Sequence, residues 1–154
     1  MVGLFINTIP ARVSLSPGMS VLEVLMQVQQ QSIAVHPYEH APLHMIQAWS
    51  EIPRGSPLFE SILIIENHVP NLYLRSQGGK WSHREFRVIE RTNYPLSLTA
   101  FIDSKLFLNI EYDLSRFDHS TSTRLLAHLR ELLCSLATGL EKRVPDLSFL
   151  PAQE

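Results

Sequence analysis

Residues 96–112 have the sequence LSLTAFIDSKLFLNIEY, and they indicate the fold class more clearly than any other stretch. Apolar side chains alternate with other types from Leu96 to Ile102 and again from Leu106 to Tyr112, with Asp-Ser-Lys between the two runs. A period of two is typical of strands, and the short polar turn joins the two runs. We therefore predict a β-hairpin with one buried, apolar face.

Two more extended segments are predicted upstream of the hairpin. Four consecutive aliphatic residues within 61–66 indicate a strand that is covered on both faces. Residues 2–15 indicate an extended element as well, in which Pro10 allows only an edge strand or a bend. Residues 70–85 show little apolar periodicity and contain a Gly-Gly pair, so we predict a long loop or excursion there.

Helices are expected on both sides of these strands. Ser20 and Glu23 have the spacing of a capping box, which predicts a helix over 21–35. Pro42 then opens a short helix that extends to Trp49, because proline is tolerated in a first helical turn. Strands together with helices define an α/β protein.

The last helix is the most clearly marked element. Asp118 or Ser120 can cap it, and Gly139 ends it. Its broad apolar stripe consists of Leu125, Leu126, Leu129, Leu132, Leu133 and Leu136. Cys134 lies within this stripe, so we predict a thiol in or near the core. Residues 142–154 contain two prolines and resemble a tether that leaves the domain.

The composition excludes several classes of function. The chain has 154 residues, which is the size of one domain, and its 13 basic and 15 acidic residues give a net charge of −2 without clusters of either sign. We therefore expect no nucleic acid and no membrane surface as partner, and the longest apolar run is too short to span a bilayer. A single cysteine rules out an internal disulfide and favours the cytoplasm. Charged residues are only 18%, an excess of uncharged surface that hints at a missing neighbour.

No catalytic or metal-binding motif is evident in the residues themselves. His36, His40 and His44 recur at intervals of four, but prolines interrupt any helix that would align them, so no metal site is expected. The sequence contains neither a Gly-x-Ser-x-Gly elbow nor a glycine-rich phosphate loop. Glu39, Glu60 and Glu66 could serve as paired acids, although salt bridges and helix caps are the default for such residues.

Several segments, taken together and in order, resemble one known family. They are Val-Gly-Leu-Phe-Ile-Asn-Thr at 2–8, Tyr-Glu-His-Ala-Pro-Leu at 38–43, Pro-Leu-Phe-Glu at 57–60, Thr-Asn-Tyr-Pro-Leu at 92–96, Arg-Phe-Asp at 116–118 and the junction at 147–151. In this order they resemble the condensation domain of nonribosomal peptide synthetases, which has the chloramphenicol acetyltransferase-like fold. Within this fold, the segment at 5–8 favours the branch that forms peptide bonds over the epimerisation domains. It argues less strongly against the heterocyclisation domains.

The resemblance implies a partial chloramphenicol acetyltransferase-like lobe, a mixed sheet with flanking helices. Residues 1–141 would be a C-terminal lobe fragment, and residues 142–154 a linker toward a following adenylation domain. The complete domain would form a peptide bond between aminoacyl or peptidyl thioesters on carrier proteins. The family's His-His-x-x-x-Asp-Gly motif is absent, since the seven histidines include no adjacent pair. We therefore expect no catalytic residue here and no activity without the N-terminal lobe.

The implied partners are the missing N-terminal condensation lobe, a peptidyl carrier protein and the adenylation domain. No cofactor would be bound directly, because the carrier proteins present the phosphopantetheine arms. A non-catalytic module that docks carrier proteins, or a degenerate relic, is the alternative.

Four side chains are candidates for lining the substrate tunnel. Asn7 and Thr8 follow an apolar segment and could bond substrate amides; the alternative is a turn bonded to the backbone. Ser97 and Thr99 lie opposite the leucine face of their strand, and the alternative is that they are ordinary outward residues. The excursion at 70–85 would contain the family's crossing segment between the lobes.

Overall fold

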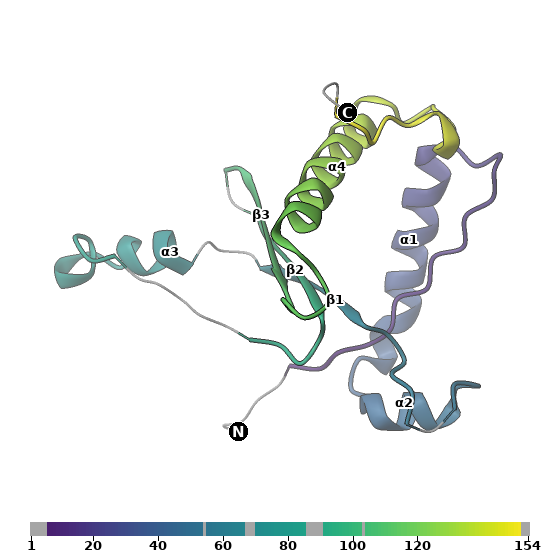
Figure 1. Ribbon diagram of the computed structural model, residues 1–154, viewed down its shortest axis with the longest axis horizontal. Helices are drawn as coiled ribbons and strands as arrows, with labels where there is room; N and C mark the ends of the chain where they lie inside the picture. The colour runs from purple at the N-terminus through teal and green to yellow at the C-terminus, as the bar shows by residue number, and fades with distance from the viewer. Residues whose placement is uncertain (1–5, 54, 67–69, 86–90, 103, 152–154) are drawn as a thin grey trace. The chain divides into compact units, whose positions relative to one another are not determined.

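The computed structural model describes residues 6–53, 55–66, 70–85, 91–102 and 104–151. The chain divides into two compact units. Unit 1 contains residues 1–59 and 127–154, and unit 2 contains residues 60–126. Figure 1 shows the elements of each unit in chain order.

Unit 2 is built on a three-stranded mixed sheet. Its strands are β1 (Ser61–Glu66), β2 (Leu96–Ile102) and β3 (Leu106–Tyr112), in the order β1-β2-β3. β1 runs parallel to β2, and β2 pairs with β3 as an antiparallel hairpin (Figure 1). The hairpin and the upstream strand are therefore confirmed, and so is the α/β class with a mixed sheet and flanking helices.

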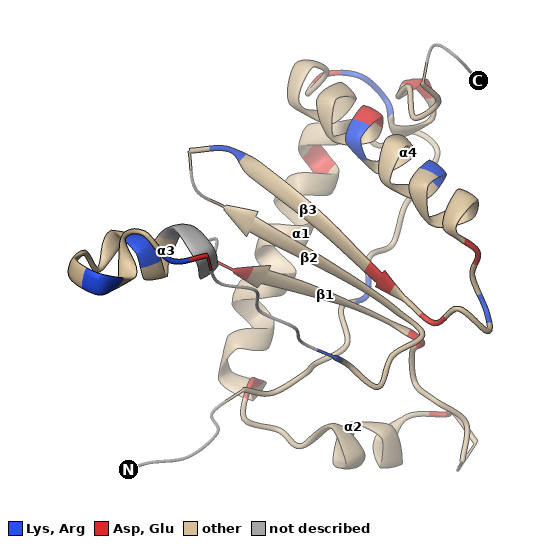
Figure 2. Ribbon diagram, turned by 60° about the vertical axis from the view of Figure 1, so that its left-hand side comes forward, with Lys and Arg blue, Asp and Glu red and all other residues tan. Residues whose placement is uncertain are grey.

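One face of the edge strand β1 is open, although the face continues onto the more buried strand β2. Leu63 pairs with Leu98 and Ile65 with Ala100, so these four side chains share a face. Leu63 is 60% exposed and Ile65 is 61% exposed, although the strands carry few charges (Figure 2). The prediction that this strand is covered on both faces is wrong for the described residues, because Leu63 and Ile65, which share a face, are largely exposed.

The segment between β1 and β2 contains helical turns that the sequence did not indicate. α3 (Pro70–Ser76) is followed by a 3₁₀ turn, Gly79–Trp81. The prediction of a plain loop was wrong here because seven residues are too few to show an apolar helical repeat. Gly78 and Gly79 adopt φ angles of +74° and +58°, a conformation that glycine enters without steric cost.

The first two helices of unit 1 begin and end where the sequence predicts. α1 (Val21–Val35) starts with a complete capping box at Ser20, and α2 (Leu43–Trp49) begins directly after a proline. A 3₁₀ turn, His36–Tyr38, lies between them. Residues 6–15 form no strand, so the predicted extended element is absent from its described part, and residues 2–5 lie outside the described ranges.

α4 (His119–Thr138) is the longest helix, with residues 119–126 in unit 2 and residues 127–138 in unit 1. Of the two predicted caps, Asp118 is the one used, since its Oδ1 accepts a hydrogen bond from the Thr121 N–H at 2.6 Å. Cys134 is exposed, which corrects the prediction of a core thiol. The next residue, Ser135, is the buried one, because a step of one residue rotates the side chain by about 100° around the helix.

Candidate functional site

Asn7, the first predicted site residue, is bonded to its own chain. Its Nδ2 donates to the carbonyl oxygen of Glu39 at 2.8 Å and to that of Ala41 at 2.7 Å. These bonds use both hydrogens of the amide group, so Oδ1 is the atom that can accept a hydrogen bond from another molecule. The contact also ties the segment after residue 5 to the loop 39–41, and a role toward substrate stays a prediction.

Thr8 follows directly and is half-buried. The loop that Asn7 holds is also braced from within, since Ala41 donates its backbone N–H to Tyr38 at 2.9 Å and the His36 ring lies 3.0 Å from the Glu39 carboxylate. The described part of the first family-like segment, residues 6–8, is thus bonded to the second, residues 38–43, within unit 1. Glu39 therefore has a hydrogen-bonding partner in its own segment of the chain.

Ser97 and Thr99 lie on one face of the central strand β2 and are buried, with exposed fractions of 2% and 7%. The alternative interpretation, in which both side chains face outward into solvent, is therefore wrong. The Ser97 hydroxyl lies 2.6 Å from the Thr92 hydroxyl, which also accepts a hydrogen bond from the Tyr94 N–H at 3.2 Å. The chain that enters β2 therefore occupies one hydrogen-bonding position of the Ser97 hydroxyl.

A charged pair joins the two ends of the described sheet segment. Arg116 donates from Nη1 and Nη2 to the two carboxylate oxygens of Glu60, at 3.0 and 2.9 Å. Glu60 directly precedes β1 and Arg116 follows β3, so this bidentate pair links chain segments 56 residues apart. Nearby, the Asp113 N–H donates to the Pro95 carbonyl at 2.9 Å, which fixes the turn that presents Arg116.

The charged pair shifts both pKa values. The hydrogen bonds from Arg116, together with its charge, lower the pKa of Glu60, and the same contacts raise the pKa of Arg116. The backbone and side-chain hydrogen bonds of Ser115 lower the pKa of Asp113. All three groups therefore remain charged at neutral pH.

We expect Arg116→Gln to raise the pKa of Glu60 toward the ordinary glutamate range, because the guanidinium is its main stabilising partner. A depressed carboxyl pKa stabilises the fold above the unfolded-state pKa, and this contribution is lost as the pH falls through the folded-state pKa. The titration of Glu60 followed by NMR measures the shift. The exposed Arg130→Gln on α4 is the control, and equal Glu60 pKa values in all three proteins would contradict the pairing.

The four predicted residues are neutral, so they can donate or accept hydrogen bonds but cannot move a proton near neutral pH. Asn7 and Thr8 belong to unit 1, whereas Ser97 and Thr99 belong to unit 2. The sequence analysis missed the pair of Glu60 and Arg116. A signal was present, since the two residues carry opposite charges and each lies in a segment that resembles the family.

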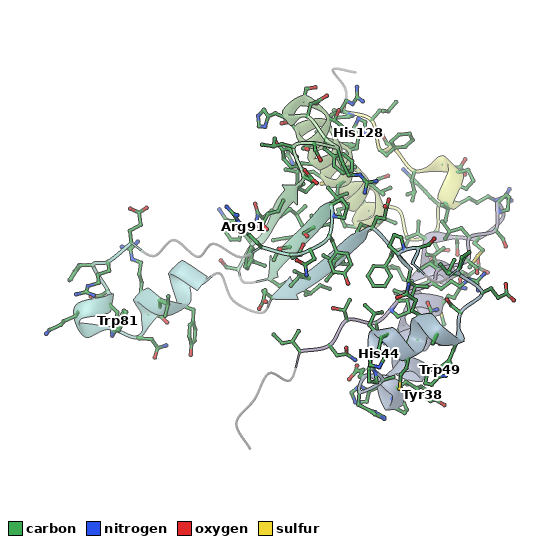
Figure 3. The ribbon with its side chains drawn as sticks, turned by 60° about the horizontal axis from the view of Figure 1, so that its bottom comes forward. Tyr38, His44, Trp49, Trp81, Arg91 and His128 are labelled. Atoms are coloured by element: carbon green, nitrogen blue, oxygen red, sulfur yellow. The ribbon has the colours of Figure 1, made fainter. Side chains whose placement is uncertain are left out.

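Unit 1 also exposes aromatic side chains. Figure 3 shows Tyr38 at the end of the 3₁₀ turn, and His44 and Trp49 on α2. The side chains of Tyr38 and Trp49 are largely exposed. Among the residues that the structure describes, no three His, Cys, Asp or Glu side chains are grouped to hold a metal ion. Over the same residues, no helix combines the length and apolar character needed to cross a membrane.

Comparison with known proteins gives the class. The family model of the condensation domain matches residues 1–154, the whole chain. The chain belongs to the condensation domain family, which confirms the resemblance found in the sequence.

The similar proteins are large synthases. Two of them are linear gramicidin synthase subunits of Brevibacillus parabrevis, one 38% identical over 156 residues and the other 37% identical over 154 residues. Tyrocidine synthase 2 of Brevibacillus parabrevis is 33% identical over 159 residues. Each alignment covers all of this chain but only 2 to 4% of the relative's length.

Proposed function

We propose that this chain is the C-terminal portion of a condensation domain that, when complete, forms a peptide bond between thioesters on carrier proteins. One observation carries the proposal, namely that the condensation domain model matches every residue although the histidine motif of the family is missing from the sequence. The exposed Leu63 and Ile65 support it, because apolar side chains on an open sheet face are what a missing part of the same domain would cover.

The proposed reaction is an aminolysis. The acceptor's amine nitrogen attacks the donor's thioester carbonyl carbon, a C–N bond forms and the C–S bond breaks. The sulfur leaves as the thiol of the donor's phosphopantetheine arm, and it takes up the proton that the nitrogen loses. Holding the two groups in attack geometry supplies much of the rate, since oriented reactants gain a large effective molarity. The absent histidine would position the amine or accept its proton.

The chain's own residues would contribute to substrate positioning. Asn7 would use Oδ1 toward a substrate N–H, because its Nδ2 is already bonded to the chain, and Thr8 would add a hydroxyl. Ser97 and Thr99 would form part of the tunnel wall from their buried face. Residues 70–85 would include the crossing segment toward the N-terminal lobe. A cytoplasmic location, a peptidyl carrier protein and an adenylation domain as neighbours complete the proposal.

A second candidate is a non-catalytic module that docks carrier proteins. The specific observation in its favour is the pair of largely exposed aromatic side chains, Tyr38 and Trp49. Large exposed aromatic side chains are enriched at protein interfaces, so this surface could bind a partner without any chemistry.

A titration by calorimetry separates the two candidates. The probe for the first is the part of the condensation domain that precedes the matched residues in the linear gramicidin synthase subunit with 37% identity, and the probe for the second is a phosphopantetheine-loaded carrier protein. We expect the chain to bind the first probe, and Ile65→Asp to weaken this binding at least about tenfold because it places a charge in an apolar contact. Leu114→Asp, at another exposed apolar position of unit 2, is the control.

Binding of the carrier protein alone, abolished by Trp49→Ala, would replace the first function with the second. Absence of binding to either probe would contradict both.

A further inference from the structure

The first turn of α1 is capped by the chain's own C-terminal segment. A helix leaves its first four backbone N–H groups without partners inside the helix. Here the Val21 N–H donates to the carbonyl of Lys142 at 2.9 Å, and the Leu22 N–H donates to that of Leu140 at 3.0 Å. The other two lie within the capping box, where the Glu23 N–H donates to the Ser20 hydroxyl at 3.2 Å and the Ser20 N–H donates to the Glu23 carboxylate at 2.7 Å. All four donors are therefore satisfied, two of them by residues that follow α4.

The contact is reciprocal. The Val144 N–H donates back to the Met19 carbonyl at 3.0 Å, and Ser20 and Arg143 form an antiparallel bridge. The side chain of Val21, enclosed at this point, is fully buried. The C-terminal segment thus both accepts hydrogen bonds from the start of α1 and donates one to the residue before its cap. These bonds fix which residues of the segment lie beside the start of α1.

A second anchor lies on α4, also within unit 1. The Ser148 N–H donates to the hydroxyl of Ser135 at 3.2 Å, and Ser135 is buried. The ring of Phe149 meets the His128 ring edge-on, with 6.0 Å between the centroids. Between the two anchors, the 3₁₀ turn Val144–Asp146 shortens the path from α1 to α4.

The side chains between the anchors follow the same arrangement. Val144 and Leu147 are half-buried, whereas Pro145 and Asp146 are exposed. The two aliphatic side chains of this turn are thus more buried than the two residues between them, whereas Leu140 and Phe149 are 44% and 51% exposed.

We propose that residues 140–149, which we call the strap, are an integral part of unit 1 and fix the direction in which the chain continues after Leu150. The strap places the start of the linker after Phe149, whereas the sequence predicted it at residue 142. The chain beyond Leu150 then starts from a fixed position on unit 1.

Amide hydrogen exchange on the 154-residue chain tests the strap. The N–H groups of the first helical turn normally exchange quickly, so protection at Val21 and Leu22 reports the strap carbonyls. We expect both amides to exchange at least about tenfold more slowly than in a chain that ends at Gly139, and as slowly as in a chain that ends at Pro151. Equal, rapid exchange in the 154-residue chain and in the chain that ends at Gly139 would overturn the proposal.

A point variant keeps the test valid if the shorter chain does not fold. Ser135→Ala removes the acceptor of the Ser148 N–H, so exchange at Ser148 should rise about tenfold. Thr123→Ala, which removes an exposed hydroxyl from the same helix, should leave exchange at Ser148 unchanged. NMR order parameters of about 0.85 over 140–149 support the strap, and values below about 0.6 would contradict it.

Discussion

Replacing Val21 with aspartate is expected to lower the free energy of unfolding of unit 1 by about 3 kcal/mol or more. Val21 is fully buried, and its N–H donates to the Lys142 carbonyl. An acidic residue in a first helical turn gains about 0.3–1 kcal/mol from the helix dipole, which is too little to offset the burial of a carboxyl group. The loss should appear as a lower Tm when thermal unfolding is followed by the helical signal in circular dichroism.

The control for this change is Leu22→Asp. It places the same charge in the same helical turn, where the side chain is exposed, so it receives the dipole contribution without the burial cost. We expect it to unfold close to the unmodified chain. If the two variants had equal Tm values, Val21 would not be part of the core of unit 1.

Replacing Ser97 with alanine is expected to cost about 1–3 kcal/mol, because the Thr92 hydroxyl loses a partner 2.6 Å away in a half-buried position. Thr92→Ala should cost a similar amount. The double variant should cost less than the sum, since the two hydroxyls bond each other and their removal together leaves neither unpaired. Urea unfolding of the four proteins measures this coupling.

Ser104→Ala, in the exposed turn between β2 and β3, is the control and should be neutral. Additive costs for Ser97 and Thr92 would show that the two hydroxyls are not coupled. A loss of kcat/KM in the complete domain, with unfolding unchanged, would assign the Ser97 hydroxyl to the substrate instead of to Thr92.

Signals that act over a few residues were sufficient to predict much of the fold. The capping box at Ser20 predicted the start of α1, and alternation with a period of two predicted both strands of the hairpin. These predictions succeed because caps and alternation are local properties of the backbone. The helix α3 was missed for the complementary reason, since a helix this short has no repeat to detect.

Contacts between distant segments could not be predicted in the same way. The bond from Asn7 to Glu39 and Ala41, the pair of Glu60 and Arg116, and the strap each join segments that no local pattern relates. The resemblance identified several of these segments, yet it did not show which of them meet. Only the fold brings the partners within hydrogen-bond distance.

The burial of polar side chains was the second weakness of the sequence analysis. The alternative for Ser97 and Thr99, that they face outward, was open because polar residues on a half-buried sheet usually face water. They are buried because β2 is the central strand and the chain before it returns over Ser97. Cys134 shows the opposite error, in which an apolar neighbourhood in sequence suggested a burial that the helix geometry gives to Ser135.

Dipeptide formation is the measurement closest to the central claim. Aminoacyl-loaded donor and acceptor carrier proteins are mixed with the 154-residue chain, with and without the preceding part of the condensation domain, and the thioester-bound product is quantified by mass spectrometry. We expect background levels from the chain alone and product only when both parts are present, because the proposed function assigns the reactive histidine to the added part. Turnover by the chain alone, with the added part making no difference, would contradict the account.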